Sequence, residues 1–216
     1  MLVKDIMTKD VITITGDTYV LDAEKIMYSH KIGRLPIVDS IENNRLIGIV
    51  TKDDVLKASP SSTTPYNQRQ LFYLVSKLTV KEIMKTKVIT VTPSTTIEKA
   101  VAIAQKHRIG SLPVVEGEKV VGILTTNDVF YKILNPLLGI GETGTRLTVY
   151  NAGTCEGFHK VTDMIIKAGL KVKTFWIPKD PVGKSLVLHL DTEDVSSIKE
   201  EIERSGYKVE LRDFKV

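Results

Sequence analysis

Hydrophobic and polar residues alternate along the chain in a pattern that occurs twice. Stretches of alternating β-branched residues, Val11 to Thr15 and Val88 to Thr92, predict short strands. A helix is expected after each strand, because apolar residues recur there at helical spacing. These apolar positions are Val20, Ala23, Ile26 and Met27 in the first copy, and Ile97, Ala100, Val101 and Ala104 in the second.

Each copy continues with two further strands and a second helix. The predicted strands are 35–39 and Leu46 to Val50 in the first copy, and 112–116 and Val120 to Leu124 in the second. The second helices begin near Asp54 and Asp128. Strand, helix, strand, strand, helix is an α+β unit, so the pattern predicts this fold class for both copies.

The two copies also match residue by residue. KDIM at 4–7 returns as KEIM at 81–84, KIGRLP at 31–36 as RIGSLP at 108–113, and GIVTKDDV at 48–55 as GILTTNDV at 122–129. A duplicated unit of about 55 residues suggests two halves around a pseudo-two-fold axis, with equivalent clefts at their interface. This arrangement favours a ligand sensor over a catalyst.

The remaining chain divides into a linker and a third part. Residues 58–67 are rich in Ser, Thr and Pro, and the apolar spacing from Leu71 to Leu78 predicts a connecting helix. Pro136 and the glycines that follow it end the duplicated region. The predicted organisation is repeat 1 at 1–57, linker and connecting helix at 58–77, repeat 2 at 78–135 and a last domain at 145–216.

The last domain has its own pattern. Strands are expected at 146–151, 171–177, 185–190 and 207–212, and helices at Phe158 to Ala168 and about Val195 to Ser205. The order strand, helix, strand, strand, helix, strand predicts a ferredoxin-like βαββαβ domain. A loop that contains two glycines, 151–157, joins its first strand to its first helix.

Composition narrows the possible functions. Thirty Lys and Arg against 26 Asp and Glu give a formal net charge of +4. This mild excess suits small molecules that carry phosphate, and it is too diffuse to indicate nucleic acid. The single cysteine excludes an intramolecular disulfide, and we find neither a signal peptide nor an apolar span long enough for a bilayer. We therefore expect a cytoplasmic protein that does not enter the membrane.

The motif Gly-x-x-Thr-x-x-Asp occurs at equivalent places in both copies. It contains Thr51 and Asp54 in the first copy, and Thr125 and Asp128 in the second. A carboxylate at a helix start can accept hydrogen bonds from ribose hydroxyls, and a threonine hydroxyl with backbone N–H groups can meet phosphate. The same spacing is also close to a helix capping box. Both interpretations stay open.

A second motif precedes each buried strand. Gly33 and Gly110 permit close approach of a flat ligand, although a tight turn into a strand explains them equally well. The next residue differs between the copies, Arg34 in one and Ser111 in the other. Arg34 can contact phosphate in a bidentate manner, so we expect the two clefts to be chemically unequal.

Other candidate chemistry is weak. The four histidines lack the spacing of a zinc site, and we predict no metal. Cys155 lies in the glycine-bearing loop ahead of a helix, where a thiolate can be activated, but no partner histidine is recognisable. We predict no catalytic residue.

Taken together, KDIM, VITI, IGRLPIVD and GIVTKDDV resemble paired CBS domains, over roughly positions 1–135. The resemblance implies an adenosyl ligand, either AMP, ADP, ATP or S-adenosylmethionine, in the clefts between the copies. It implies that Asp54 and Asp128 hold ribose and that Thr51 and Thr125 face phosphate. The remaining implied contacts are Val11, Ile12, Thr13, Val88, Ile89, Thr90, Gly33 and Gly110 around adenine, with Arg34 on phosphate and Ser111 in its place in the other copy.

The last domain resembles an ACT domain by topology alone, which implies an amino-acid site at loop 151–157. The whole arrangement is similar to regulatory proteins of the acetoin-utilisation protein B type. That similarity implies a homodimer that senses a nucleotide and signals to a metabolic enzyme, in acetoin or other carbon catabolism. Two alternatives remain: an assembly protein with empty clefts, and an enzyme that uses Cys155.

Overall fold

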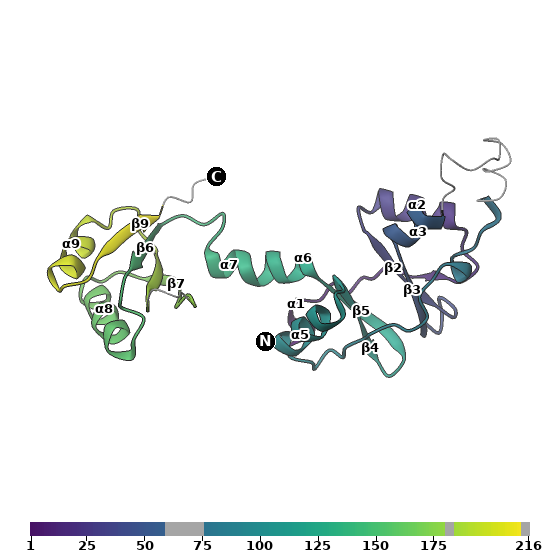
Figure 1. Ribbon diagram of the computed structural model, residues 1–216, viewed down its shortest axis with the longest axis horizontal. Coiled ribbons are helices and arrows are strands. Elements are labelled where there is room, and N and C mark those ends of the chain that lie inside the picture. The colour runs from purple at the N-terminus through teal and green to yellow at the C-terminus, as the bar shows by residue number, and fades with distance from the viewer. Residues whose placement is uncertain (59–75, 180–183, 213–216) are drawn as a thin grey trace. The chain divides into compact units, whose positions relative to one another are not determined.

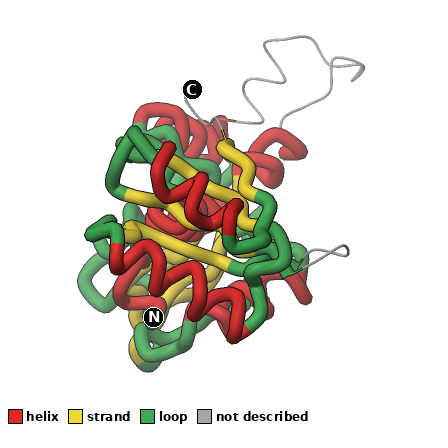
Figure 2. The backbone as a smooth tube through the Cα atoms, turned by 90° about the vertical axis from the view of Figure 1, so that its left-hand side faces the viewer, coloured by secondary structure: helices red, strands yellow, loops and turns green. Residues whose placement is uncertain are grey.

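The computed structural model describes residues 1–58, 76–179 and 184–212. The chain forms two compact units, Met1–Val129 and Phe130–Val216, and each is described by itself (Figure 1). Helices alternate with short strands and loops along the described chain (Figure 2). The predicted linker at 58–67, except for Ala58, and most of the predicted connecting helix at 71–78 lie outside the described residues.

The first unit contains both copies of the repeat. The first copy consists of α1 (Val3–Ile6), β1 (Ile14–Thr15), α2 (Val20–Ser29), β2 (Arg34–Val38), β3 (Leu46–Thr51) and α3 (Lys52–Ala58). The second consists of η1 (Val80–Glu82), α5 (Ile97–His107), β4 (Ser111–Glu116), β5 (Lys119–Thr125) and α6 (Thr126–Val129). Both hairpins, β2–β3 and β4–β5, are antiparallel and carry a bulge at the equivalent place. The α+β character predicted from the pattern is confirmed.

The strand predicted at the start of each copy is mostly wrong. Only Ile14–Thr15 forms a strand in the first copy, and the second has a single bridge between Val91 and Val114. In that bridge, Val91 donates to the carbonyl of Pro113, and Val115 donates to the carbonyl of Val91. The ladder cannot extend toward Ile89, because Pro113 would have to donate and has no N–H group. Sequence periodicity does not reveal this stop.

The segment that opens each copy of the repeat, near Thr8 in the first and Lys85 in the second, pairs with the hairpin of the other copy. Thr8 pairs with Ile123 of the second hairpin, and Lys85 pairs with Ile49 of the first. The methionine before each pairing residue packs on a glycine. A Cβ on Gly48 would lie 2.6 Å from Met84 Sδ, and a Cβ on Gly122 would lie 2.5 Å from Met7 Sδ. These crossed contacts explain why a cleft between the copies contains residues of both.

The core of the first copy follows from its apolar strands. Strand β2 is buried at four successive positions, because helices α2 and α3 and the opening segment of the second copy enclose it. Full burial of an aliphatic side chain contributes about 1.5–3 kcal/mol, so this strand anchors the hairpin that carries the Thr–Asp motif. The buried core residues are Ile14, Val20, Ala23, Met27, Leu35, Ile37, Val50, Val55 and Val80.

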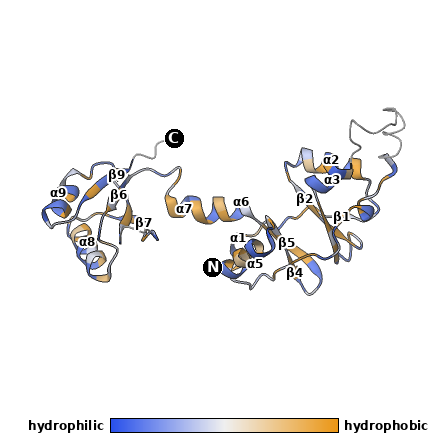
Figure 3. Ribbon diagram, in the orientation of Figure 1, coloured by the Kyte–Doolittle hydropathy of each residue, from blue (hydrophilic) through white to orange (hydrophobic). Residues whose placement is uncertain are grey.

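The second unit follows the predicted βαββαβ order. It contains η2 (Phe130–Leu134), α7 (Asn135–Leu138), β6 (Thr145–Val149), α8 (Cys155–Lys167), β7 (Val172–Trp176), β8 (Leu186–Leu190), α9 (Ser196–Arg204) and β9 (Val209–Arg212). The sheet has the order β7-β8-β6-β9, and all neighbouring strands are antiparallel. Helices α8 and α9 carry both hydrophilic and hydrophobic residues and bury their apolar sides in the core (Figure 3).

Among the residues that the structure describes, no helix combines the length and the apolar character needed to cross a membrane.

Candidate functional site

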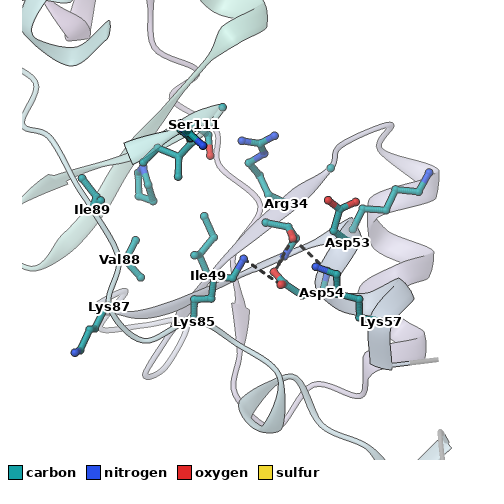
Figure 4. Close-up of a pocket in the computed structure, with 17 residues that line it drawn as sticks. Arg34, Ile49, Asp53, Asp54, Lys57, Lys85, Lys87, Val88, Ile89 and Ser111 are labelled. Carbon is teal, nitrogen blue, oxygen red and sulfur yellow. Dashed lines mark hydrogen bonds and ion pairs between the residues drawn. The ribbon is translucent and has the colours of Figure 1, made fainter. Parts of the chain in front are cut away.

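Two clefts lie between the copies of the repeat in the first unit. The first cleft, with a volume of about 470 Å³, contains Thr51 and Asp54 of the first copy with Val88 and Ile89 of the second. Figure 4 shows Val88 and Ile89 across this cleft from Asp54. The volume lies in the range of small-molecule sites, about 300–1,000 Å³.

The second cleft has a volume of about 370 Å³ and is the pseudo-symmetric counterpart. It contains Thr125 and Asp128 of the second copy with Val11 and Ile12 of the first. The crossed opening segments therefore bring each Thr–Asp motif next to a backbone segment of the other copy.

The Thr–Asp motif of the first cleft forms a reciprocal cap where β3 ends and α3 begins. Thr51 donates to Asp54 Oδ2 twice, from its backbone nitrogen at 3.0 Å and from Oγ1 at 2.6 Å. The backbone nitrogen of Asp54 donates back to Thr51 Oγ1 at 3.3 Å. These hydrogen bonds confirm that the motif forms a helix cap. It also fixes the carboxylate in one orientation, which preorganises an acceptor at the cleft.

The motif of the second cleft repeats this geometry. Thr125 donates to Asp128 Oδ2 from its backbone nitrogen at 2.8 Å and from Oγ1 at 2.6 Å, and the nitrogen of Asp128 donates back at 3.2 Å. Asp128 is buried, with 6% exposure.

The other carboxylate oxygen differs between the clefts. Lys85 Nζ lies 3.1 Å from Asp54 Oδ1, whereas Thr8 Oγ1 donates to Asp128 Oδ1 at 3.2 Å. Burial acts to raise the pKa of Asp54, but the hydrogen bond from Thr51 and the contact with Lys85 outweigh it, so the pKa is lowered. Asp54 is consequently ionised at neutral pH and acts as an acceptor.

Twelve of the fourteen residues expected at the site line one or both clefts, while Thr13 and Thr90 line neither. Gly33 and Gly110 line both clefts. A Cβ on Gly33 would meet no atom within 4 Å, so the space above this backbone is open. A Cβ on Gly110 would lie 3.4 Å from Arg34 Nη1, so the Arg34 guanidinium lies over that glycine.

The expected division, an arginine for one cleft and a serine for the other, differs from what the structure shows. Arg34 lines both clefts, and Ser111 is a buried residue of the first. Burial lowers the pKa of Arg34, and the nearby charge of Asp53 opposes that effect. Arg34 nevertheless stays cationic, because a guanidinium is not deprotonated in proteins.

The sequence interpretation missed the residues that distinguish the clefts most. Lys85 and Lys87 line the first cleft, while the equivalent positions of the second hold Thr8 and Asp10. The signal was present in the sequence, since KDIMTKD at 4–10 aligns with KEIMKTK at 81–87. Only the crossing of the opening segments shows that these positions reach the clefts.

In the described part of the chain, no three His, Cys, Asp or Glu side chains are grouped to hold a metal ion. Cys155 is a free, exposed thiol at the first position of α8.

A family model for the CBS domain matches residues 3–61 and 80–135, which include both copies of the repeat. The chain belongs to the CBS-domain family. The two copies are a CBS pair, and the two clefts are the clefts of that pair.

Curated relatives contain the CBS pair as one part of a larger protein. The chain is 35% identical over 129 residues to the L-aspartate semialdehyde sulfurtransferase of Methanocaldococcus jannaschii, which covers 59% of this chain and 22% of that enzyme. The chain therefore spans about a fifth of that relative.

Two solved structures match the CBS pair over nearly their whole length. An AcuB protein of Vibrio cholerae, assigned to acetoin utilization, has a TM-score of 0.54 and 33% identity, and the match covers 65% of this chain and 94% of that one. CBSX2 in complex with AMP has a TM-score of 0.51 and 28% identity, and covers 62% of this chain and 96% of that one.

Proposed function

We propose that this protein is a regulatory CBS-pair protein that binds adenosyl ligands, AMP, ADP, ATP or S-adenosylmethionine, in its two clefts. One observation carries the proposal. Each cleft is lined by an oriented carboxylate from one repeat and by a backbone segment from the other repeat that is not part of a strand. The AMP complex of CBSX2, which has the same kind of domain pair, supports this ligand class.

In this proposal, the ribose hydroxyls donate to Asp54 in the first cleft and to Asp128 in the second. Thr51 and Thr125 orient these carboxylates through their 2.6 Å hydrogen bonds, which use the single hydroxyl proton that a contact with phosphate would need. Carboxylates are strong acceptors, and hydrogen bonds to a charged group contribute about 1.5–3 kcal/mol. A ligand thus gains affinity from a group that is ordered before it binds.

The adenine base would lie against the segments that contain Ile12 and Ile89. Because Pro36 and Pro113 end the parallel ladder at equivalent places, the backbone at these two residues is directed to a cleft instead of to a neighbouring strand. Backbone N–H and C=O groups suit the polar edge of adenine. Open space above Gly33 suits its flat face.

Such a ligand would act by bridging the two repeats. A ligand that binds one arrangement of the pair better than another shifts the population between them, which makes the module a sensor. The signal would pass to a metabolic enzyme through a homodimer, and the likeness to AcuB supports a role in acetoin or other carbon catabolism.

The second unit would add a further regulatory surface. Its βαββαβ order and antiparallel sheet are compatible with a ferredoxin-like domain of the ACT type. The segment 151–157, which is a loop as far as Thr154 and then the first turn of α8, would be the amino-acid site. It packs closely against the start of β8, where a Cβ on Gly153 would meet the carbonyl of Lys184 at 2.5 Å.

A thermal-shift panel of AMP, ADP, ATP, S-adenosylmethionine and amino acids tests the proposal. We expect an adenosyl ligand to raise the melting temperature, and Asp54→Ala with Asp128→Ala to abolish that shift. Asp54→Asn with Asp128→Asn is a second variant that keeps the side-chain shape. The absence of a shift with every adenosyl ligand would favour an assembly protein with empty clefts.

A further inference from the structure

The two clefts carry different charges. Six cationic and two acidic side chains line the first cleft: Arg34, Lys52, Lys57, Lys85, Lys87 and Arg108, with Asp53 and Asp54. Two cationic and two acidic side chains line the second: Lys31 and Arg34, with Asp10 and Asp128. The first cleft has an excess of positive charge, and the second is balanced.

The difference arises at equivalent positions of the two repeats. Where the first cleft has Lys85 and Lys87, the second has Thr8 and Asp10. The second of these exchanges reverses the sign of the charge. Lys52 and Asp53 of the first cleft also stand where the second has Thr126 and Asn127. The clefts therefore differ mainly in charge, and charge is the main chemical property by which they can distinguish ligands.

Each arrangement suits a different ligand chemistry. A cleft lined by one sign of charge concentrates its field and attracts the opposite sign. Lysine and arginine are the side chains that bind phosphate oxygens most strongly. A carboxylate at the position of Asp10, by contrast, repels phosphate and tolerates a neutral or cationic group.

We propose that the first cleft binds a phosphorylated adenosyl ligand and that the second binds an adenosyl ligand without phosphate. This inference rests on the proposed function, which states only that both clefts take adenosyl ligands. Both clefts have an aspartate that would accept hydrogen bonds from ribose. Selectivity would therefore depend on the group that the adenosyl moiety carries, either phosphate or a group without phosphate.

The cationic side chains of the first cleft occupy different positions and can contact different parts of a ligand. Half-buried Arg34 lies between the clefts with Asp53 nearby, and Lys85 is held on Asp54 (Figure 4). Lys87 is exposed and lies at the edge of the cleft in Figure 4, with its amine turned outward. A long lysine at this edge can turn toward the end of a polyphosphate chain, so we expect ATP to gain more from Lys87 than AMP does.

Calorimetric titrations with ATP, AMP and adenosine test the inference. The wild-type protein should bind ATP at one cleft per chain, and that affinity should fall steeply with added salt because the contacts are ionic. In Lys85→Thr with Lys87→Asp, which places the residues of the second cleft at these two positions of the first, ATP affinity should fall about tenfold or more, and adenosine affinity less than about threefold. The reciprocal variant, Thr8→Lys with Asp10→Lys, should gain a second ATP site.

A matched control separates cleft charge from net charge. Lys99→Asp with Lys106→Thr changes the net charge by the same amount at exposed lysines that line neither cleft. This variant should keep ATP affinity within about twofold of the wild type. Circular dichroism and melting temperature establish that every variant is folded.

The outcomes distinguish this inference from the function on which it rests. If no adenosyl ligand binds the wild type, the proposed function itself is overturned. If ligands bind but ATP occupies both clefts equally, or if the lysine variant loses ATP and adenosine affinity to the same degree, charge selection is overturned and the adenosyl function stands. A second ATP site in the reciprocal variant supports both.

Discussion

Lys85 Nζ lies 3.1 Å from Asp54 Oδ1, so a lysine from one repeat is paired with the central carboxylate of the other. The lysine side chain is 62% exposed and the carboxylate side chain only 11%. In the other cleft, Thr8 makes the equivalent contact without a charge. The pair therefore distinguishes the two clefts and ties the opening segment of the second repeat to the first.

The first prediction concerns the pH dependence of this pair. The folded-state pKa of Asp54 is lowered from 3.8, so the ionised carboxylate stabilises the folded state at any pH above that value. The stabilisation is lost as pH falls through the lower folded-state pKa. Asp54→Asn should reduce the free energy of unfolding by about 1 kcal/mol or less at neutral pH, because Lys85 is largely exposed.

Urea unfolding of the wild type and of Asp54→Asn across pH measures this effect. The difference between the two proteins should be constant from about pH 5 to about pH 7 and should shrink below the ordinary carboxyl pKa. A difference that grows on acidification would show that Asp54 is not stabilised in its ionised form.

The second prediction concerns the crossed methionines. A Cβ on Gly48 would lie 2.6 Å from Met84 Sδ and 3.3 Å from the carbonyl of Lys85. Overpacking of this kind costs about 1–3 kcal/mol. Gly48→Ala should therefore lower the urea midpoint, and Gly122→Ala should do so by a similar amount through Met7.

Gly33→Ala is the matched control, because a Cβ at this position would meet no atom within 4 Å. It should change the free energy of unfolding by about 0.5 kcal/mol or less. Truncation of the methionine should relieve the overlap, so Gly48→Ala and Met84→Ala should be less than additive. If the losses of stability from Gly48→Ala and Met84→Ala were additive, the strain caused by the added methyl group would lie elsewhere in the hairpin.

The third prediction concerns the second unit, where Trp176 on β7 is the single tryptophan of the chain. Gly144 has a φ of +110°, and a Cβ there would overlap the carbonyl of Leu190 on β8. Gly144→Ala should destabilise this unit by about 2 kcal/mol or more, from backbone strain together with overlap. Tryptophan fluorescence during urea unfolding reports the change.

Gly169→Ala separates the two causes. Gly169 has a φ of +68°, but a Cβ there would meet no atom within 4 Å. Its cost should come from the left-handed backbone alone, about 1 kcal/mol. Equal costs at both glycines would mean that the sheet yields to the added methyl group.

The sequence predicts the repeat, its α+β character and the Thr–Asp motifs that line the clefts, because hydrophobic periodicity and duplicated motifs are local properties. The prediction from sequence fails where a residue far away in the chain determines the local structure. Pro113 stops the ladder that alternation predicts at Val88 to Thr92. Periodicity describes each strand alone and contains no information about the donor that its neighbour lacks.

The position of Arg34 is a second case that the sequence alone does not predict. The sequence assigns it to one repeat and hence to one cleft, but its long side chain lies over Gly110 of the other repeat and lines both. The resemblance to CBS domains implies that Thr13 and Thr90 lie around adenine with the rest of their segments, yet they line neither cleft. Which side of an irregular segment faces a cleft depends on tertiary contacts that no spacing rule reveals.

The last prediction follows from the shared position of Arg34. Arg34→Ser, which copies the residue at the equivalent position 111, should weaken ligand binding at both clefts, whereas Lys85→Thr should act on the first alone. For AMP the loss should be about tenfold or more, since a bidentate contact between guanidinium and phosphate is removed. Arg34→Lys keeps the charge but lacks the planar fork, so it should restore only part of the affinity. Calorimetry with AMP and with adenosine measures the two losses, and unchanged adenosine affinity in Arg34→Ser would show that the guanidinium acts only through a phosphate and not at both clefts.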